Sequence, residues 1–233
     1  MKKINIFNLI MSLIIVVGDV GYMLHGTIIQ KSVVSACFVI MGAVNLIYAV
    51  RVQKQFNMFM LMMLLGLFFA MLGDIVLEIE FIIGALLFAV GHVFFLVSYI
   101  TLKKYCIKDL IISLSIFIPC VFVILFVPIF DFGGIMMQMV CIFYALIITL
   151  MTGKAIANYT NEKSAFNLVV MIGSLLFIFS DLMLLFNVFG EVGRWAGVLC
   201  LATYYPAQCV LAYSILKGAN AKKAEANLIT DSK

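Results

Sequence analysis

Residues 57–78 read NMFMLMMLLGLFFAMLGDIVLE. This stretch is apolar almost throughout, and it has the length of about 20 residues that a helix needs to cross a bilayer. Asp74 stands inside it, directly after Gly73. A carboxylate in the hydrocarbon region is costly unless it is paired, protonated or hydrated, so an acid at this depth indicates a functional site.

Two more apolar segments carry an acid directly after a small residue, as Gly18-Asp19 and Ser180-Asp181. Counted from the starts of their segments, Asp19, Asp74 and Asp181 are the sixteenth, eighteenth and seventeenth residues. At a rise of about 1.5 Å per residue, the three carboxyls lie at nearly one depth. The spacing therefore predicts a common polar site within the membrane.

The whole chain has the same apolar character. Of its 233 residues 66% are apolar and 11% are charged, which leaves too few polar residues to cover a soluble domain. We predict an all-α, polytopic integral membrane protein with one transmembrane domain at residues 1–216 and a polar cytoplasmic C-terminal tail at 217–233. Its eight-helix bundle would consist of residues 4–24, 32–50, 57–78, 81–102, 109–128, 134–152, 165–187 and 193–216.

Basic residues orient these segments. Of the 15 lysines and arginines, all but Lys31 and Arg194 fall on one side of the predicted membrane. By the positive-inside rule this side is cytoplasmic, and an even number of helices places both termini there. The three acids then lie in the extracytoplasmic half, and we expect a bacterial inner membrane. The net charge of +4 reflects this topology and does not indicate a nucleic-acid partner.

Polar residues on two returning segments are expected to complete the site. His92 lies near the middle of segment 81–102, and segment 193–216 contains Tyr204, Tyr205 and Gln208. Pro206 would bend the last helix at this point, because it removes a backbone hydrogen bond.

Helix periodicity adds expectations for the remaining segments. A spacing of seven places Asn5, Ser12 and Asp19 on one face of the first helix. Segments 109–128 and 134–152 have little polar character apart from Gln138 and Tyr144, and we expect them to buttress the bundle. Glu78 and Glu80 would form a solvated rim.

Each of these residues also has a purely structural interpretation. A single membrane aspartate can serve as a hydrogen bond between helices, and His92 can be a packing residue. Catalytic zinc sites typically use two or three histidines. The chain has only His25 and His92, far apart in sequence, so we predict no zinc site, while an all-carboxylate site for another metal remains open. Motifs of serine hydrolases and phosphate-binding loops are absent from the sequence.

The sequence resembles the YhhN-type lysoplasmalogenase family in two pairs of motifs. They are Gly73-Asp74-Ile75-Val76-Leu77 followed by Gly91-His92, and Phe179-Ser180-Asp181-Leu182 followed by Tyr204-Tyr205-Pro206-Ala207-Gln208. The resemblance implies hydrolysis of the vinyl-ether bond of lysoplasmalogens, which gives a fatty aldehyde and glycerophospho-ethanolamine or -choline. It implies no cofactor, and a lysophospholipid substrate that enters laterally from the membrane lipid.

The chemistry that the resemblance implies suits the acids found. Protonation of the alkene carbon gives an oxocarbenium ion that water captures, as in glycoside hydrolysis. Asp74 and Asp181 would share the acid and base roles. The residues expected to orient them or to bind the substrate are Asp19, His92, Ser180, Tyr204, Tyr205 and Gln208.

The alternative is a proton-coupled transporter or a lipid-handling protein that uses the same carboxyls as proton carriers. It would need a polar route through both halves of the membrane. The sequence offers only Asn5, Ser12 and Asn45 in the cytoplasmic half, which favours a site open to one side.

Overall fold

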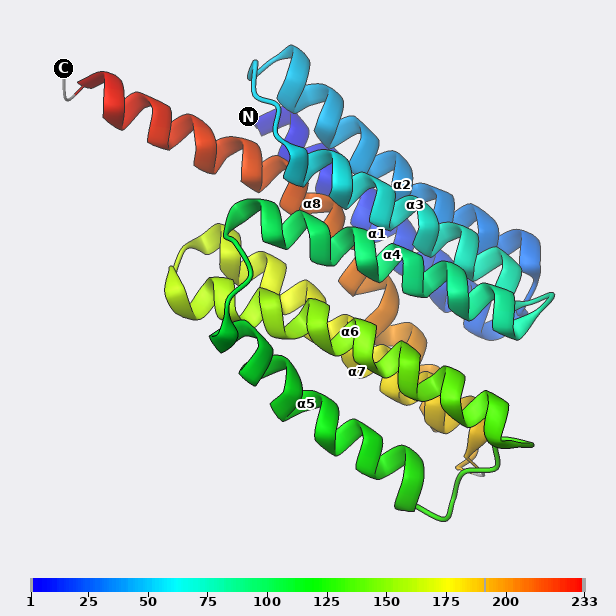
Figure 1. The fold of residues 1–233 in the computed structure, drawn as a ribbon. Coiled ribbons are helices and arrows are strands. Elements are labelled where there is room, and N and C mark those ends of the chain that lie inside the picture. The colour runs from blue at the N-terminus through cyan, green and yellow to red at the C-terminus, as the bar shows by residue number, and fades with distance from the viewer. Residues whose placement is uncertain (1, 191, 232–233) are drawn as a thin grey trace.

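The computed structural model describes residues 2–190 and 192–231, with side chains as far as Asn220 apart from that of His25. This part of the chain forms eight α-helices, and its only β-type pairing is an isolated bridge between Phe130 and Gly190. Figure 1 shows the helices, which are α1 (Lys2–His25), α2 (Ile28–Arg51), α3 (Met58–Leu77), α4 (Phe81–Leu102), α5 (Ile107–Phe126), α6 (Ile135–Asn161), α7 (Ala165–Phe189) and α8 (Trp195–Asp231).

Each of these eight described helices is long and apolar enough to cross a membrane, which confirms the predicted all-α, multi-pass architecture. The predicted ends differ most for α6 and α8. Helix α6 continues to Asn161 because the charge of Lys154, which interrupts the apolar pattern, is neutralised inside the protein. In α8 the apolar part ends at Asn220, and the alanine- and lysine-rich residues that follow favour a helix.

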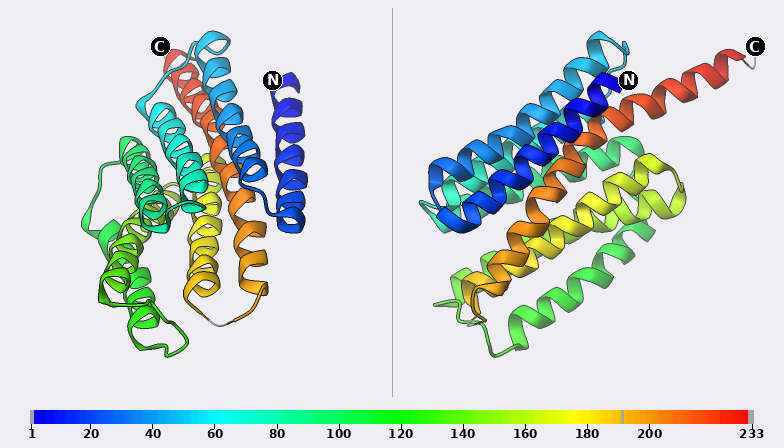
Figure 2. Two further views of the ribbon diagram at one scale, coloured as in Figure 1. Left: turned by 90° about the vertical axis from the view of Figure 1, so that its right-hand side faces the viewer. Right: turned by 180° about the vertical axis from the view of Figure 1, so that it is seen from behind.

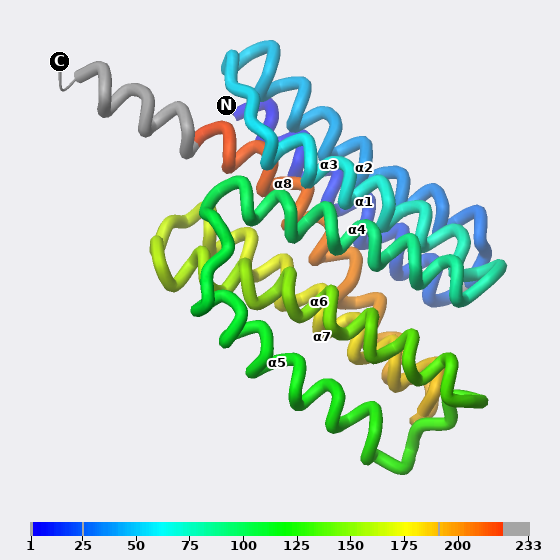
Figure 3. The backbone as a smooth tube through the Cα atoms, in the orientation of Figure 1, coloured from blue at the N-terminus to red at the C-terminus, as the bar shows by residue number. Residues whose placement is uncertain are grey.

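The helices form two groups that α8 connects. Helices α1 to α4 lie side by side, α5 to α7 form a second group, and α8 crosses obliquely between them (Figures 1 and 2). Helix α8 contacts α1, α2 and α3 on one side and α7 on the other. Among the described helices, α5 contacts only α6, and the tube in Figure 3 shows it at the edge of the molecule.

Small residues let α3 and α4 approach closely. A Cβ atom on Gly84 would lie 2.5 Å from the Cα atom of Leu77, and one on Gly73 would lie 2.6 Å from the Phe88 ring. Glycine is therefore required where these backbones meet, as at many helix contacts in membranes. The close approach places Phe88 of α4 beside the segment of α3 that carries Asp74.

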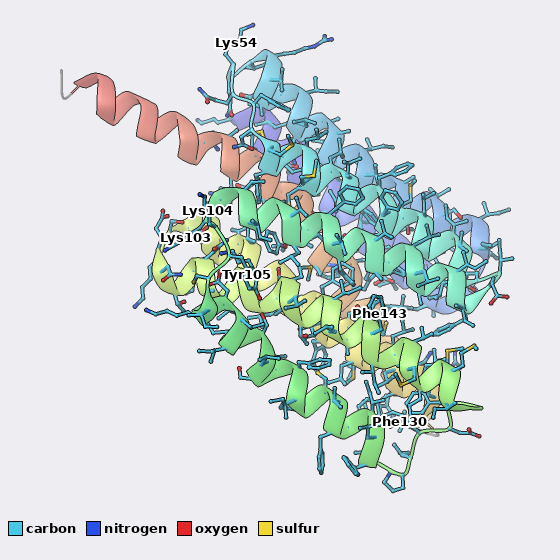
Figure 4. The ribbon with its side chains drawn as sticks, in the orientation of Figure 1. Lys54, Lys103, Lys104, Tyr105, Phe130 and Phe143 are labelled. Carbon is cyan, nitrogen blue, oxygen red and sulfur yellow. The ribbon has the colours of Figure 1, made fainter. Side chains whose placement is uncertain are left out.

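Lysines gather at one end of the bundle. Lys54, Lys103 and Lys104 lie at the end where α1 begins and α8 finishes, whereas Phe130 lies at the opposite end (Figure 4). We call these the basic end and the far end. Their charge difference agrees with the predicted topology, and the cytoplasmic location of the basic end remains a prediction from the positive-inside rule.

The buried face of α1 differs from the predicted one. Asn5 is exposed, while Asn8 and Asp19 are buried. The reason lies in α2, where Asn45 exchanges two amide hydrogen bonds of 2.9 and 2.8 Å with Asn8. These bonds rotate the first helix so that Asn8 faces the bundle in place of Asn5.

A buried ion pair joins α5 and α6 near the basic end. The Lys154 Nζ lies 2.6 Å from the Asp109 Oδ2, and both side chains have an exposed fraction of 0%. Lys154 also donates to the carbonyl of Lys104 at 3.1 Å. In the sequence Lys154 is one of the basic residues that indicate topology, and in the structure it is also a buried partner of Asp109.

Candidate active site

Asp74 holds three helices together. Ser35 of α2 and Tyr204 of α8 both donate hydrogen bonds to its Oδ2, at 2.6 and 2.7 Å. The hydroxyl of Tyr205 lies 3.3 Å from that of Ser35 and extends the network. Asp74 is 3% exposed, so this carboxyl is enclosed by protein.

Asp181 forms a second network with α4 and α6. The Tyr144 hydroxyl donates to its Oδ2 at 2.6 Å. The His92 Nε2 lies 2.8 Å from the Tyr144 oxygen and 3.3 Å from the same carboxyl oxygen. With the proton on Nε2, His92 donates to Tyr144 and Tyr144 donates to Asp181. The Nδ1 of His92 is buried without a hydrogen-bond partner among the described residues.

Aromatic rings separate the two networks. The Phe177 ring lies 4.6 Å from the His92 ring and 5.4 Å from the Tyr204 ring, measured between centroids. Within the described part of the chain, the hydrogen bonds of Asp74 and of Asp181 have no residue in common. The two acids are thus placed in adjacent networks at one depth, as the seventeenth residues of α3 and α7.

A pocket gives access to one acid only. Its volume is about 100 Å³, and its walls are almost entirely apolar side chains of α4, α5, α6 and α7, with Leu77 from the end of α3. Asp181 and Tyr144 supply its polar groups, and the Asp181 side chain is 12% exposed. Asp74 is absent from the described walls, whereas Phe88, which lines the pocket, lies beside Gly73 and the Tyr204 ring. A molecule in the pocket can therefore touch Asp181 and not Asp74.

The other residues predicted for the site lie close by with different contacts. Asp19 is buried on α1, near enough to Asp74 for their charges to interact. The Ser180 hydroxyl lies 3.6 Å from the Cys200 sulfur, and no described hydrogen bond joins it to either acid. Gln208 is buried beside the Tyr204 hydroxyl, but the described residues form no well-aligned bond to its amide.

Sequence reasoning missed Ser35 and Tyr144. Ser35 lies inside the second apolar segment, and Tyr144 lies in a segment expected only to buttress the bundle. Each is a hydroxyl deep in an apolar segment, and Tyr144 is the tenth residue of α6, at the depth of His92 on the neighbouring helix. The depth of Tyr144, close to that of His92, was the signal in the sequence that could have identified it.

Glu78 is exposed at the rim, as predicted, and it also forms a clamp that the sequence did not predict. It follows α3 at the far end, where Lys31 binds it at 2.7 Å and the Tyr22 hydroxyl donates to it at 2.8 Å. Partial burial alone would raise the pKa of Glu78, but the bond and charge of Lys31 and the bond from Tyr22 outweigh it and lower the pKa. The ionised clamp joins α1, α2 and α3.

We expect this clamp to make stability depend on pH. Because folding lowers the pKa of Glu78, its contribution is complete above the ordinary value of 4.5 and is lost as the pH falls through the lower pKa of the folded state. Glu78 is about one-third exposed, so solvent screening limits the effect to about 1 kcal/mol.

Chemical unfolding of Glu78→Gln and wild type in detergent, at neutral and acidic pH, measures this contribution. The variant should be less stable at neutral pH, and the difference should shrink on acidification. A difference that stays the same at every pH would contradict the assignment. Glu80→Gln, at an exposed position two residues away, is the matched control.

The described side chains, which exclude that of His25, bear on metal binding. These side chains contain no group of three or more His, Cys, Asp or Glu residues placed to hold a metal ion. What the arrangement offers is acid–base chemistry, with a carboxyl supported by a phenol and an imidazole on the wall of an apolar pocket.

Comparisons with known proteins identify a family for most of the chain. Residues 33–215 match the model of the YhhN family. The matched region contains both acids of the candidate site and every hydrogen-bonding partner described for them. No curated protein and no solved structure matches the chain.

Proposed function

Because the chain belongs to the YhhN family, we propose that it hydrolyses the vinyl-ether bond of lysoplasmalogens within the membrane. Family membership fits a membrane hydrolase of the lysoplasmalogenase type. The observation that carries the specific reaction is Asp181, which lies on the wall of an apolar pocket and is held there by Tyr144 and His92. The pocket suits a hydrocarbon chain, and the carboxyl suits proton transfer to that chain.

Asp181 acts first as the acid. Its protonated carboxyl transfers a proton to the alkene carbon that is not bonded to oxygen, and the ether becomes an oxocarbenium ion. The resulting carboxylate stabilises this cation and then accepts a proton from the water that attacks it. The hemiacetal formed transfers its hydroxyl proton to the ether oxygen and separates into a fatty aldehyde and the glycerol hydroxyl of the phospholipid product.

Tyr144 and His92 orient Asp181 for these steps. The Tyr144 hydroxyl and the His92 Nε2 both lie beside Oδ2, so Oδ1 can face the bound chain. The bond from Tyr144 is short and persists when the carboxyl is ionised, which favours the state formed after proton transfer. His92 donates to Tyr144 and fixes the direction of the phenol.

Asp74 supports the site from behind the aromatic rings. Its bond to Tyr204 fixes a ring that packs on Phe177, which in turn packs on His92. We propose that it acts through this packing and through its charge, without touching the lipid. Asp19, Tyr205 and Gln208 belong to the same supporting layer, and Ser180 supports α7 against α8.

The polar part of the lipid is proposed to lie toward the far end. Arg194 is exposed just before α8 at that end, where a phosphate can reach it. With the basic end in the cytoplasm, the site opens to the extracytoplasmic half of the membrane, which we expect to be a bacterial inner membrane.

Proton-coupled transport is the second reading of the same acids, and packing in the basic half argues against it. That half holds more polar groups than the sequence suggested, since Tyr99 and Ser174 form a 2.9 Å hydrogen bond inside it. Between this pair and His92, however, lie Phe95 and Phe177, each with an exposed fraction of 0%. A proton path to the basic end would have to cross these rings.

Aldehyde release by the purified protein in detergent tests the proposal. We expect release from a lysoplasmenyl lipid and none from the matched alkyl-ether lysolipid, which lacks the double bond that accepts the proton. An acyl lysolipid of equal chain length separates this activity from ester hydrolysis. Well-folded protein that releases no aldehyde would rule out this substrate, and proton-coupled transport would then be tested in vesicles.

A further inference from the structure

A groove runs along the outside of the bundle between α4 and α6. It has a volume of about 550 Å³ and almost no polar lining. Its walls include Ala85, Leu86 and Ala89 of α4 and Met139, Val140 and Phe143 of α6. Figure 4 labels Phe143 on α6, next to α4.

The groove meets the pocket of the candidate site. Ala85, Val140 and Tyr144 line both of them. Tyr144 also holds Asp181 through its 2.6 Å hydrogen bond. The groove is therefore adjacent to the pocket whose wall contains the carboxyl.

Hydrogen bonds show where α4 and α6 separate. Counted from the far end, the first side-chain hydrogen bond between these helices among the described residues joins His92 and Tyr144. Such bonds continue toward the basic end with the bond from Asn158 to the carbonyl of Tyr99, at 3.0 Å. From Tyr144 to the far end the described residues form none, and the groove occupies this stretch.

The length of the groove matches one leaflet. Ile135 and Tyr144 mark its ends on α6, and nine residues of helix span about 14 Å. Half of the bilayer hydrocarbon core measures about 15 Å. A lipid chain in that leaflet would lie along the groove and not across it.

We propose that the hydrocarbon chain of the substrate binds in this groove and reaches Asp181 through the junction at Ala85, Val140 and Tyr144. The inference rests on the proposed function, because it makes the groove the binding site of the alkenyl chain. Ala85 is small and lies at the junction, so its size determines whether a long chain fits.

Photolabelling tests binding without relying on catalysis. The probe is a single-chain alkyl-ether lysophospholipid with a diazirine in the middle of its chain, which the proposed reaction cannot cleave. We expect labels to concentrate on residues 85–89 and 135–144. The reference is residues 111–118 of α5, which line neither the groove nor the pocket and include the equally exposed Ile111 and Ile118. Equal labelling of the two regions would overturn the proposal.

Ala85→Phe tests the junction. We expect it to reduce labelling of residues 135–144 and to lower the ratio of long-chain to short-chain vinyl-ether hydrolysis by about tenfold or more, as a lost fit in an apolar pocket does. Ala202→Phe introduces the same ring at an exposed position of α8 outside the groove and should change neither. An unchanged chain-length ratio in folded Ala85→Phe would overturn the proposal.

The two proposals fail in different ways. Labelling of the groove without aldehyde release from wild type would support the chain site and reject vinyl-ether hydrolysis. Aldehyde release from wild type, together with equal labelling of the groove and of the α5 reference, would support vinyl-ether hydrolysis and reject the chain site.

Discussion

Asp181→Asn is expected to lower aldehyde release from a lysoplasmenyl lipid by about a hundredfold or more, because removal of a positioned general acid costs that much. The amide keeps the shape of the carboxyl, and it has no acidic proton to transfer to an alkene carbon. It also cannot stabilise the oxocarbenium ion with a negative charge. The measurement is the initial rate at saturating lipid, for protein that elutes as a single species in detergent.

Two further variants distinguish the acid that contacts the lipid from residues that only position it. Tyr144→Phe removes the bond to Asp181 and leaves the acid in place, so we expect a loss of about tenfold, as for a single lost hydrogen bond of 1–2 kcal/mol. Asp74→Asn should also lower the rate of aldehyde release by about tenfold or more, because it weakens the hydrogen-bonded residues that pack behind His92. Asp181→Asn at the wild-type rate would show that another group transfers the proton.

Lys154→Met is expected to destabilise the fold more than any other single substitution considered. It leaves the Asp109 carboxylate buried without its cation, which costs several kcal/mol in protein interiors. We expect about 3 kcal/mol, the lower end of that range, because Asp109 lies in the first turn of α5, close to the basic end of the bundle. Chemical unfolding in mild detergent measures this loss of free energy.

Matched substitutions test the reason for this loss. Lys163→Met removes an exposed lysine at the same end and should change stability by no more than about 0.5 kcal/mol. Adding Asp109→Leu to Lys154→Met should recover part of the stability, since both buried charges are then gone. Recovery stays incomplete because Asp109 also accepts a bond from the Cys106 backbone at the start of α5. Equal unfolding of Lys154→Met and Lys163→Met would contradict the buried pair.

Local properties of the sequence predicted the architecture. Apolar segments of spanning length predicted eight helices, and the fixed rise per residue predicted the common depth of Asp74 and Asp181. Both predictions depend only on the order of residues within one segment. The stretch 57–78 therefore predicted α3 nearly to its ends at Met58 and Leu77.

The same reasoning could not predict which residues of different helices contact one another. The rotation of each helix about its axis follows from its neighbours, as α1 shows, where pairing with Asn45 turns Asn8 inward and leaves Asn5 outside. Glu78 lies at the exposed rim as predicted, but its ion pair with Lys31 of α2 depends on the packing of α2 against α3.

The sequence by itself determined a multi-pass helical membrane protein with acids at one depth, because hydropathy and helix rise act along a single segment. Only the tertiary structure decided that Asp74 is enclosed by Ser35 and Tyr204 while Asp181 faces a pocket beside Tyr144. These contacts join residues 37 to 130 positions apart, and the packing of side chains between helices selects them.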